Sequence, residues 1–289
     1  MSTCSQAILI ATGGVVTPPQ FTVTYVLTGG GGGGASGGAS NYNLNIYNGG
    51  AGGAGGYTSS TFTANKLTLY PITIGAGGTT PASGGGSNGG ASTFLGQTMF
   101  GGGGGGNGTT GPTNGNNGAS GGGAGGTVNY ISGSYPYEFV VATGGTGIPG
   151  QGFAGANSYA AVKSFCWSSP DKSACAGARH GGGGGGFSGA GLYAANGPGV
   201  INSISGQAIE YAKGGVGGAS VYSPGAEGTG NGGAGGLGAG NGGSGGVIVR
   251  YPKDYIIANP GGGLVYTTVI DGLDKATLIT AGIGNIMWS

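Results

Sequence analysis

Apolar residues along the chain occur in short runs, and most of these runs end in a block of glycine. Segment 21–27 places threonine between Phe, Val, Tyr and Leu and leads directly into six glycines. Segments 66–74 and 245–251 have similar β-branched and aromatic content, and 94–100 leads into a second block of six glycines. Such content is typical of β-strands. We therefore predict strands beside the glycine blocks.

The end of the chain contains less glycine. Segments 264–270 and 276–288 are apolar and β-branched, and they flank the turn sequence 271–274, which predicts a β-hairpin. Pro71 interrupts segment 66–74 and indicates an edge strand or a kink, because proline cannot donate to a strand ladder. Helix signals are weak throughout, so we expect little or no α-helix.

Glycine is the second organising pattern, with 82 glycines in 289 residues. Pure hexaglycines lie at 29–34, 101–106 and 181–186, and looser glycine-dominated stretches lie at 49–56, 121–126 and 242–246. Glycine loses more backbone freedom on folding than any other residue, and it has no side chain to bury. These segments must therefore stay disordered or order through dense backbone hydrogen bonding.

An ordered form of such segments follows from polyproline II geometry. This helix has three residues per turn and no internal hydrogen bonds, so its N–H and C=O groups point outward. Neighbouring glycine helices can approach closely and bond to one another, and we predict polyglycine II rods packed in layers. Collagen is excluded because it needs a strict Gly-X-Y repeat with abundant proline. Disordered linkers are the alternative, but the chain is 37% hydrophobic with a net charge of +1, unlike typical disordered segments.

These patterns divide the chain into three parts. Residues 1–20 form a leader or attachment arm, 21–251 a glycine-rich polyglycine II domain, and 252–289 a C-terminal β-hairpin segment. Two less repetitive inserts interrupt the glycine-rich domain, at 127–180 and 191–213. We therefore expect a mainly β and irregular fold, in which packed polyglycine II helices are flanked by strands and followed by the hairpin.

The 127–180 insert is the best candidate for specific recognition. Its candidate contact residues are Tyr135, Tyr137, Phe165 and Trp167. Exposed aromatic side chains supply large contact area with a polar handle, and they stack on sugars. The alternative is that these side chains pack the insert against the glycine framework.

Charge is sparse, with eight Lys or Arg and seven Asp or Glu residues. Lys66 is the sole charged residue between positions 1 and 137, so nucleic acid is not an expected partner. The apolar run 7–11 is too short to span a membrane and has no basic residue before it, so we expect neither membrane insertion nor a secretory signal. Synthesis and assembly in a cytoplasm are therefore expected.

Cysteine and glycine motifs give little support for chemistry. Cys166 and Cys175 lie in one loop and could close a disulfide, although a cytoplasmic product would normally keep them reduced. Together with His180 they offer three metal ligands at non-standard spacing, so we expect no metal or other cofactor. Gly-x-Ser-x-Gly at 34–38 is a chance match in so glycine-rich a chain, since no helix signal follows it. We expect no enzymatic activity.

Several strand and glycine sequences resemble those of a known family. Segment 23–28 with its hexaglycine, together with 72–78, 150–155 and 245–251, resembles the glycine-rich domain of bacteriophage tail proteins. Segment 278–288 is similar to the β-hairpins that often follow this domain. The resemblance spans roughly residues 21–289, and its strand sequences carry more weight than its glycines.

The resemblance implies a virion tail fibre, or a receptor-binding adhesin at a fibre tip whose loops touch the host surface. The implied partners are other phage tail proteins and a host surface glycan or outer-membrane protein, and the implied state is a homo-oligomer such as a trimer, or a monomeric tip. Compared with T-even-like tip adhesins, the leader at 1–20 is short and the hairpin at 252–289 is extra.

Two other functions remain open at this point. A purely structural fibre or tail component would bind only other virion proteins, with strand 247–251 and the final hairpin as its subunit interface. An ice-binding polyglycine II protein would need a flat, regular face of short residues. The bulky insert at 127–180 argues against the ice-binding hypothesis.

Overall fold

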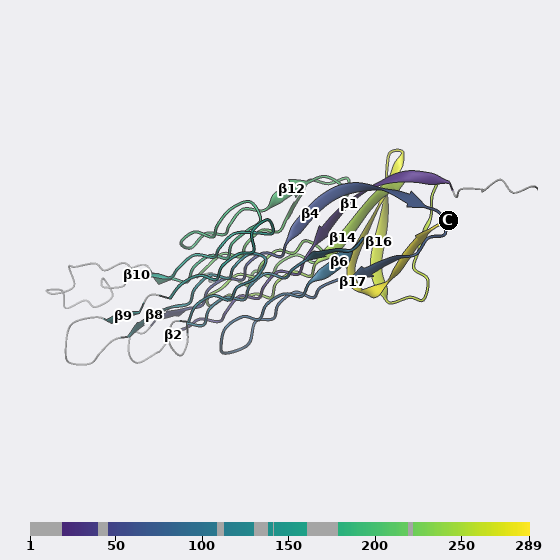
Figure 1. Cartoon of the computed structure of the whole chain (residues 1–289). Coiled ribbons are helices and arrows are strands. Elements are labelled where there is room, and N and C mark those ends of the chain that lie inside the picture. The colour runs from purple at the N-terminus through teal and green to yellow at the C-terminus, as the bar shows by residue number, and fades with distance from the viewer. Residues whose placement is uncertain are drawn as a thin grey trace, which may run out of the picture.

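The computed structural model describes residues 19–39, 46–108, 113–129, 138–140, 142–160, 179–218 and 222–289. Within these ranges the chain forms strands and irregular backbone, and no residue is helical. A large sheet occupies one end of an elongated molecule, and a bundle of nearly straight glycine-rich segments runs from it to the other end (Figure 1). The predicted fold class, mainly β and irregular with polyglycine II helices and a C-terminal hairpin, is confirmed.

Seventeen strands are described. In chain order they are β1 (Gln20–Thr28), β2 (Gly38–Ala39), β3 (Ile46–Asn48), β4 (Tyr57–Asn65), β5 (Tyr70–Thr73), β6 (Ser92–Phe94), β7 (Gln97–Met99), β8 (Gly126–Asn129), β9 (Glu138–Val140), β10 (Tyr159–Ala160), β11 (Arg179–His180), β12 (Val200–Asn202), β13 (Ile209–Tyr211), β14 (Gly246–Pro252), β15 (Ile257–Ala258), β16 (Leu264–Asp271) and β17 (Asp274–Trp288).

The large sheet has nine strands in the order β4-β1-β14-β17-β5-β6-β7, and β15 and β16 also pair with β17. The fifteen-residue strand β17 is therefore shared by much of the sheet. Aromatic side chains dominate the core on one side of it. Trp288 is fully buried, and its ring centroid lies 5.2 Å from that of Tyr70, 5.7 Å from Phe21 and 5.9 Å from Tyr251.

The strands predicted at 21–27 and 245–251 and the C-terminal hairpin are present as β1, β14 and β16–β17. Pro71 lies within β5 opposite Asn285 of β17, whereas pairing with β6 begins at Ile72. Pro71 therefore occupies a position with one strand neighbour, in keeping with its inability to donate to a ladder.

The glycine segments form a lattice of backbone hydrogen bonds, which the first hexaglycine illustrates. Gly29, Gly32 and Ala35 donate to a rod at 50–56, Gly30 and Gly33 to a rod at 87–90, and Gly31 and Gly34 to a rod at 240–243. Successive N–H groups thus point to three different neighbours and return to the first after three residues. This is the three-residue repeat of polyproline II geometry.

The carbonyl groups of the same rod accept from three further rods. Gly31 accepts from Gly78, Gly30 and Gly33 accept from Gly102 and Gly105, and Gly32 and Ala35 accept from Gly233 and Gly236. The rod at 29–35 therefore has six hydrogen-bonded neighbours. Residues 29–34 are all buried, and each of their N–H groups finds an acceptor, as buried backbone requires.

Close approach explains why these positions are glycine. A Cβ built on any residue of the three hexaglycines would overlap a neighbouring backbone carbonyl oxygen. None of these glycines has a positive φ, so an L-residue would meet no dihedral penalty there. Packing density, rather than backbone conformation, therefore fixes glycine in the rods.

Asparagine completes the lattice where a rod lacks a neighbour. A side-chain Oδ1 replaces the missing carbonyl and accepts from a rod N–H at 2.8–3.0 Å. The donor–acceptor pairs are Thr80–Asn241, Gly104–Asn88, Thr143–Asn114, Gly144–Asn157, Thr146–Asn117 and Lys213–Asn231.

Candidate functional site

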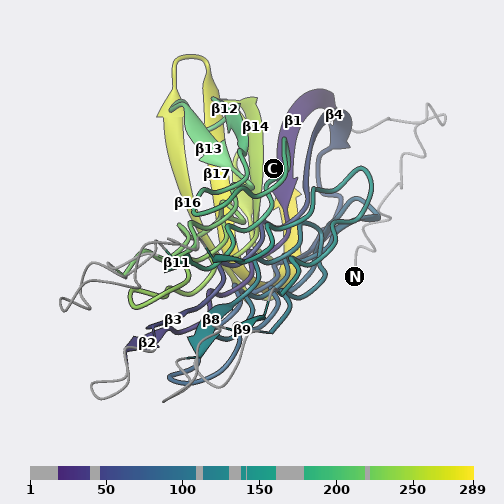
Figure 2. The ribbon, with the colours of Figure 1, turned by 90° about the vertical axis from the view of Figure 1, so that its left-hand side faces the viewer.

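The end of the molecule furthest from the large sheet carries a second group of short strands (Figures 1 and 2). Strands β2, β3, β8 and β9 form a four-stranded sheet, and β10 pairs with β11. Strands β10 and β11 lie against β8, and β11 also lies against β3. Segments that are far apart in sequence thus meet here, and we call this group the far end.

The insert predicted at 127–180 is anchored at the far end. Strands β8 and β9 bound residues 130–137, and β10 and β11 bound residues 161–178. The predicted receptor contacts and cysteines lie outside the described residues and stay predictions: Tyr135, Tyr137, Phe165, Trp167, Cys166 and Cys175. The structure places the ends of the segments that carry them next to one another.

The second insert, predicted at 191–213, lies beside the large sheet. Its strands β12 and β13 pair with each other. Ile204 and Tyr211 are buried in a cluster with Val26 and Ile248 of the sheet, and Asn202 Nδ2 donates to Tyr57 Oη at 2.9 Å. Much of this insert therefore packs against the framework.

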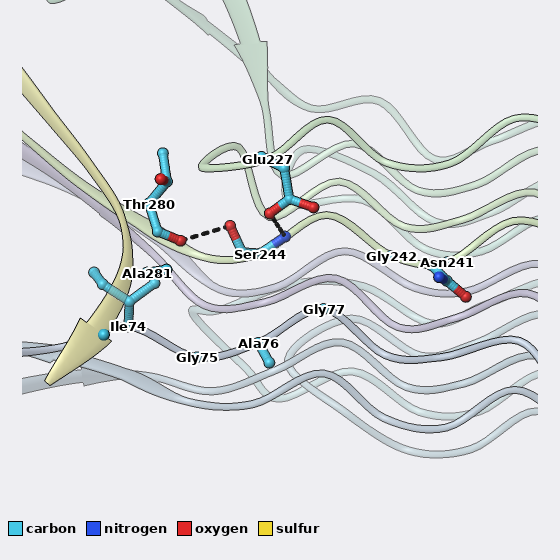
Figure 3. Close-up of a pocket in the computed structure, with 11 residues that line it drawn as sticks. Ile74, Gly75, Ala76, Gly77, Glu227, Asn241, Gly242, Ser244, Thr280 and Ala281 are labelled. Carbon is cyan, nitrogen blue, oxygen red and sulfur yellow. Dashed lines mark hydrogen bonds between the residues drawn. The ribbon is translucent and has the colours of Figure 1, made fainter. Parts of the chain in front are cut away.

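A groove lies where the rods meet the large sheet (Figure 3). It has a volume of about 340 Å³ and is lined by residues 74–77, 241–242 and 280–282 together with Glu227 and Ser244. Ser244 Oγ donates to Thr280 O at 2.9 Å, and Glu227 Oε2 accepts from Ser244 N at 3.4 Å. Glu227 is the one titratable side chain among the lining residues. The lining therefore does not supply the pair of carboxyl groups that glycoside hydrolysis typically uses.

Sequence reasoning did not single out Glu227. The signal was available, because Glu227 is the one charged residue between Lys213 and Arg250. An isolated carboxylate in an otherwise uncharged glycine-rich stretch is a candidate for a specific structural or functional role. In the structure this carboxylate serves a backbone N–H, so its observed role is in the framework.

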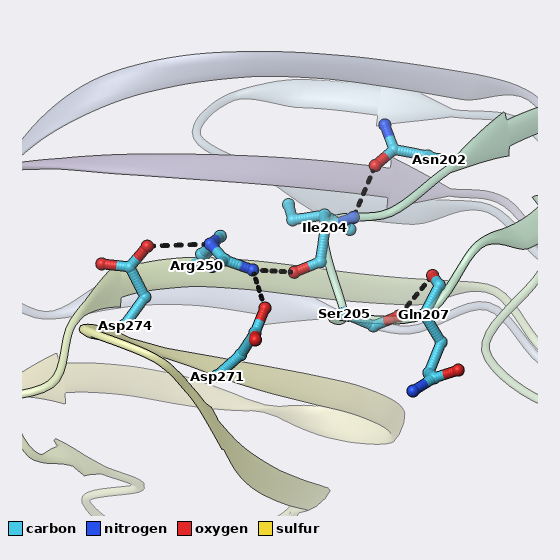
Figure 4. Close-up of polar contacts among 7 residues, drawn as sticks. All are labelled: Asn202, Ile204, Ser205, Gln207, Arg250, Asp271 and Asp274. Atoms are coloured by element: carbon cyan, nitrogen blue, oxygen red, sulfur yellow. Dashed lines mark hydrogen bonds and ion pairs between the residues drawn. The ribbon is translucent and has the colours of Figure 1, made fainter.

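Arg250 on β14 forms the main ion cluster of the large sheet (Figure 4). Its Nη1 lies 2.7 Å from Asp271 Oδ2 and its Nε lies 2.9 Å from Asp274 Oδ2. Nη1 also donates to Ile204 O at 3.4 Å. The hydrogen bonds that Arg250 donates to Asp271 and to Asp274 raise the pKa of Arg250. The cluster ties the tip of the β16–β17 hairpin to β14.

A second ion pair serves the β12–β13 insert. Lys213 Nζ lies 2.9 Å from Glu210 Oε2, and Glu210 Oε1 accepts from Gly199 N at 3.1 Å. Partial burial opposes ionisation of Glu210, but the hydrogen bonds from Lys213 and Gly199 together with the Lys213 charge lower the pKa of Glu210. Both clusters therefore use their charges to hold chain segments together.

The described ranges contain neither a group of possible metal ligands nor a helix that could span a membrane. No three His, Cys, Asp or Glu side chains in these ranges gather to hold a metal ion. The described part of the chain also contains no helix long and apolar enough to cross a membrane.

Comparison with known proteins places the chain in a family. The model of the glycine-rich domain family matches residues 11–252. That range begins before β1 and ends at the last residue of β14, so it takes in the rods, the far end and the β12–β13 insert. A search of curated proteins finds no match. Because the match covers most of its length, the chain belongs to the glycine-rich domain family.

Proposed function

We propose that this protein is a non-enzymatic bacteriophage tail fibre component or tail adhesin that contributes to host-cell recognition and attachment. Its place would be the virion, assembled in the host cytoplasm, and its partners would be other tail proteins and a host surface glycan or outer-membrane protein. The sequence resemblance to phage tail proteins supports the phage assignment. Membership of the glycine-rich domain family is compatible with it.

The separation of two ends is the observation that carries the proposal. Segments 130–137 and 161–178, with the recognition candidates, start and finish at the far end. The large sheet and the C-terminus lie at the opposite end (Figure 1). An adhesin needs this division, because one end must attach to the particle while the other remains free for the host.

The rods between the two ends suit a stiff spacer. Their buried backbone groups bond to several neighbouring rods at once, and this interior offers glycine backbone instead of reactive side chains. Local opening would break bonds to several neighbours together, so we expect low proteolytic susceptibility. Many weak contacts presented by several copies on one particle would supply avidity without tight single sites.

Binding of labelled, purified protein to a panel of bacterial species tests the proposal. The test variants are Trp167→Ala and Tyr137→Ala, and the matched control is Phe100→Ala. Phe100 is an aromatic residue that lies outside both inserts, with 47% of its surface exposed. We expect saturable binding that both insert variants weaken about tenfold or more, as for truncation of an interface hot spot, with unchanged binding by the control.

Equal binding by all variants would overturn the assignment of recognition to the 127–180 insert. Absence of binding to every species, combined with retention of the protein in purified particles, would instead support the purely structural alternative. One observation at the sheet end favours that alternative, because residues 265–270 of strand β16 are exposed and mostly apolar.

A further inference from the structure

Strand β16 forms an exposed edge of the large sheet. Among the described residues it pairs only with β17, so its other edge carries backbone N–H and C=O groups without a strand partner. All residues from 265 to 270 are exposed, including Val265 at 61% and Ile270 at 72%. Both faces and one edge of this strand are thus open to another molecule.

The composition of β16 is that of a strand built to pair. Residues 265–270 are Val, Tyr, Thr, Thr, Val and Ile, all of them β-branched or aromatic and favourable in strands. Sheet edges are normally protected by charged side chains, proline or bulges. Residues 264–270 contain no charge and no proline, and the one irregularity lies near the start of the strand, between Val265 and Tyr266.

Strand β4, which ends the sheet on the opposite side, shows the contrast. Its exposed central residues are Ser59, Ser60 and Thr61, which are small and polar. Water can solvate such an edge at little cost, whereas the apolar side chains of β16 gain from burial. The two edges therefore differ in what they present to a partner.

We propose that β16 pairs antiparallel with β16 of a second copy of this chain, around a two-fold axis at Thr268. Such an axis is perpendicular to the sheet and keeps every side chain on its own face. Partners must then be an even number of residues apart, which places Thr268 opposite Thr268, Tyr266 opposite Ile270 and Thr267 opposite Val269. Threonine pairs and aromatic–β-branched pairs of this kind stabilise sheets.

Charge also favours a second copy as the occupant. Asp271 is the first charged residue after Leu264, and it would lie opposite Val265 rather than opposite its own counterpart. Arg250 already neutralises it at 2.7 Å. Self-pairing therefore brings no like charges together, and the main-chain hydrogen bonds of strand addition would supply affinity.

The direction of β16 is compatible with a useful dimer. In Figures 1 and 2 the β16–β17 hairpin stands across the direction of the rods. The proposed two-fold axis is perpendicular to the sheet at β16, and therefore also perpendicular to the hairpin, so it can run along the rods. In that arrangement the rod bundles of the two copies point in the same direction, although their β16 strands are antiparallel. This inference goes beyond the proposed function and does not depend on it.

The mass of the full-length protein in solution tests the pairing. At micromolar concentration we expect a mass of two chains by analytical ultracentrifugation, and a mass of one chain for Val269→Lys. The matched control Ser60→Lys adds the same charge to the opposite sheet edge, and it should stay dimeric. Val269 is 46% exposed, so thermal unfolding of the monomeric variant should remain cooperative.

Oxidative crosslinking tests the register. Two Thr268→Cys residues facing each other across the axis would lie within disulfide range, and the covalent dimer should be traced to position 268 by peptide mass mapping. Ile270→Cys is the matched control, because its thiols would each face Tyr266 and should form no bond. The wild type shows the background from its three native cysteines.

Three outcomes would overturn the proposal. These are a wild type with the mass of one chain, a Val269→Lys variant that keeps the mass of two chains, and equal crosslinking at positions 268 and 270. Loss of the dimer on removal of residues 1–18, without an effect of Val269→Lys, would assign the contact to the leader instead. Cell binding is not measured in these experiments, so their failure leaves the adhesin proposal untouched.

Discussion

At the scale of single residues, the hexaglycines are fixed by how closely the rods approach. A Cβ on Gly103 would overlap the carbonyl oxygen of Asn116. Gly103 is buried and donates to Ser120 O at 2.9 Å, and the Asn116 carbonyl accepts from Gly122 N at 2.9 Å, so neither group can move without breaking other bonds. We expect Gly103→Ala to lower the free energy of unfolding by about 3 kcal/mol, the upper range for overpacking a dense interior. Denaturant unfolding of the purified protein measures this.

Ala76→Ser provides the control for that substitution. Ala76 lies in a rod but is exposed, so a polar substituent there meets solvent and should change the stability by less than about 0.5 kcal/mol. Comparable losses in both variants would contradict the close packing of the rods.

Tyr251 gives a prediction about pH. It is 1% exposed, and its hydroxyl pairs with Thr277 Oγ1 at 2.9 Å. Burial is the main cause that raises the pKa of Tyr251, while hydrogen bonds from Thr277 and Thr268 oppose the shift and the nearby Tyr266 adds to it. A raised pKa means that the unfolded chain loses this proton first. The contribution of Tyr251 to stability is therefore complete below pH ~10 and declines as the pH rises further.

Unfolding of Tyr251→Phe from pH 7 to 11 checks the prediction. At neutral pH the variant should lose about 1 kcal/mol with its hydrogen bond, and above pH ~10 the gap to the wild type should close. Tyr222→Phe, which removes a hydroxyl from a residue that is 61% exposed, should run parallel to the wild type. A constant gap for Tyr251→Phe across the whole pH range would refute the argument.

At the scale of elements, the sequence predicts those strands whose side chains do the packing. β1 and β14 alternate or cluster apolar residues because they cross the middle of the sheet. β4 escaped prediction because its centre is exposed and therefore built from Ser and Thr. The sequence also suggested strand 247–251, together with the final hairpin, as a subunit interface. In the structure β14 lies between β1 and β17, and its residues Val247, Ile248 and Val249 are fully buried within the sheet of one chain.

The order of the rods could not be predicted from sequence. Glycine offers no side chain that marks its neighbour, so nothing in the residues 29–34 indicates that Gly31 bonds to Gly243. The strands decide this order. β1 continues directly into the rod at 29–34, and a rod at 240–245 leads directly into β14, so pairing of β1 with β14 sets those two rods side by side. The insert at 127–180 is visible in the sequence as a less repetitive segment, but its anchoring by β8–β11 depends on that lattice.

At the scale of the whole molecule, the sheet and the lattice are joined through strand β17. The family match ends at residue 252, whereas Ile279, Ile286 and Trp288 of β17 fill the sheet core. β17 also lies between β14 and β5. Residues 252–289 thus contribute to the same folded body as the glycine-rich region that precedes them.

A chain truncated after residue 252 should therefore lose more than its hairpin. Without β17, the paired edge of β14 is bare and the buried side chains of Val249 and Tyr251 face water, which costs about 1.5–3 kcal/mol for each large apolar side chain. Because strands set the positions of the rods, we expect rod amides to lose their protection against hydrogen exchange together with the sheet.

Hydrogen-exchange mass spectrometry on the full chain, the truncated chain and the Leu273→Ser variant tests this prediction. Leu273 is 77% exposed at the hairpin tip, so that control should keep full protection. Persistent protection of residues 29–34 and 101–106 in the truncated chain would show instead that the polyglycine lattice holds itself together, with the sheet as an attachment to it.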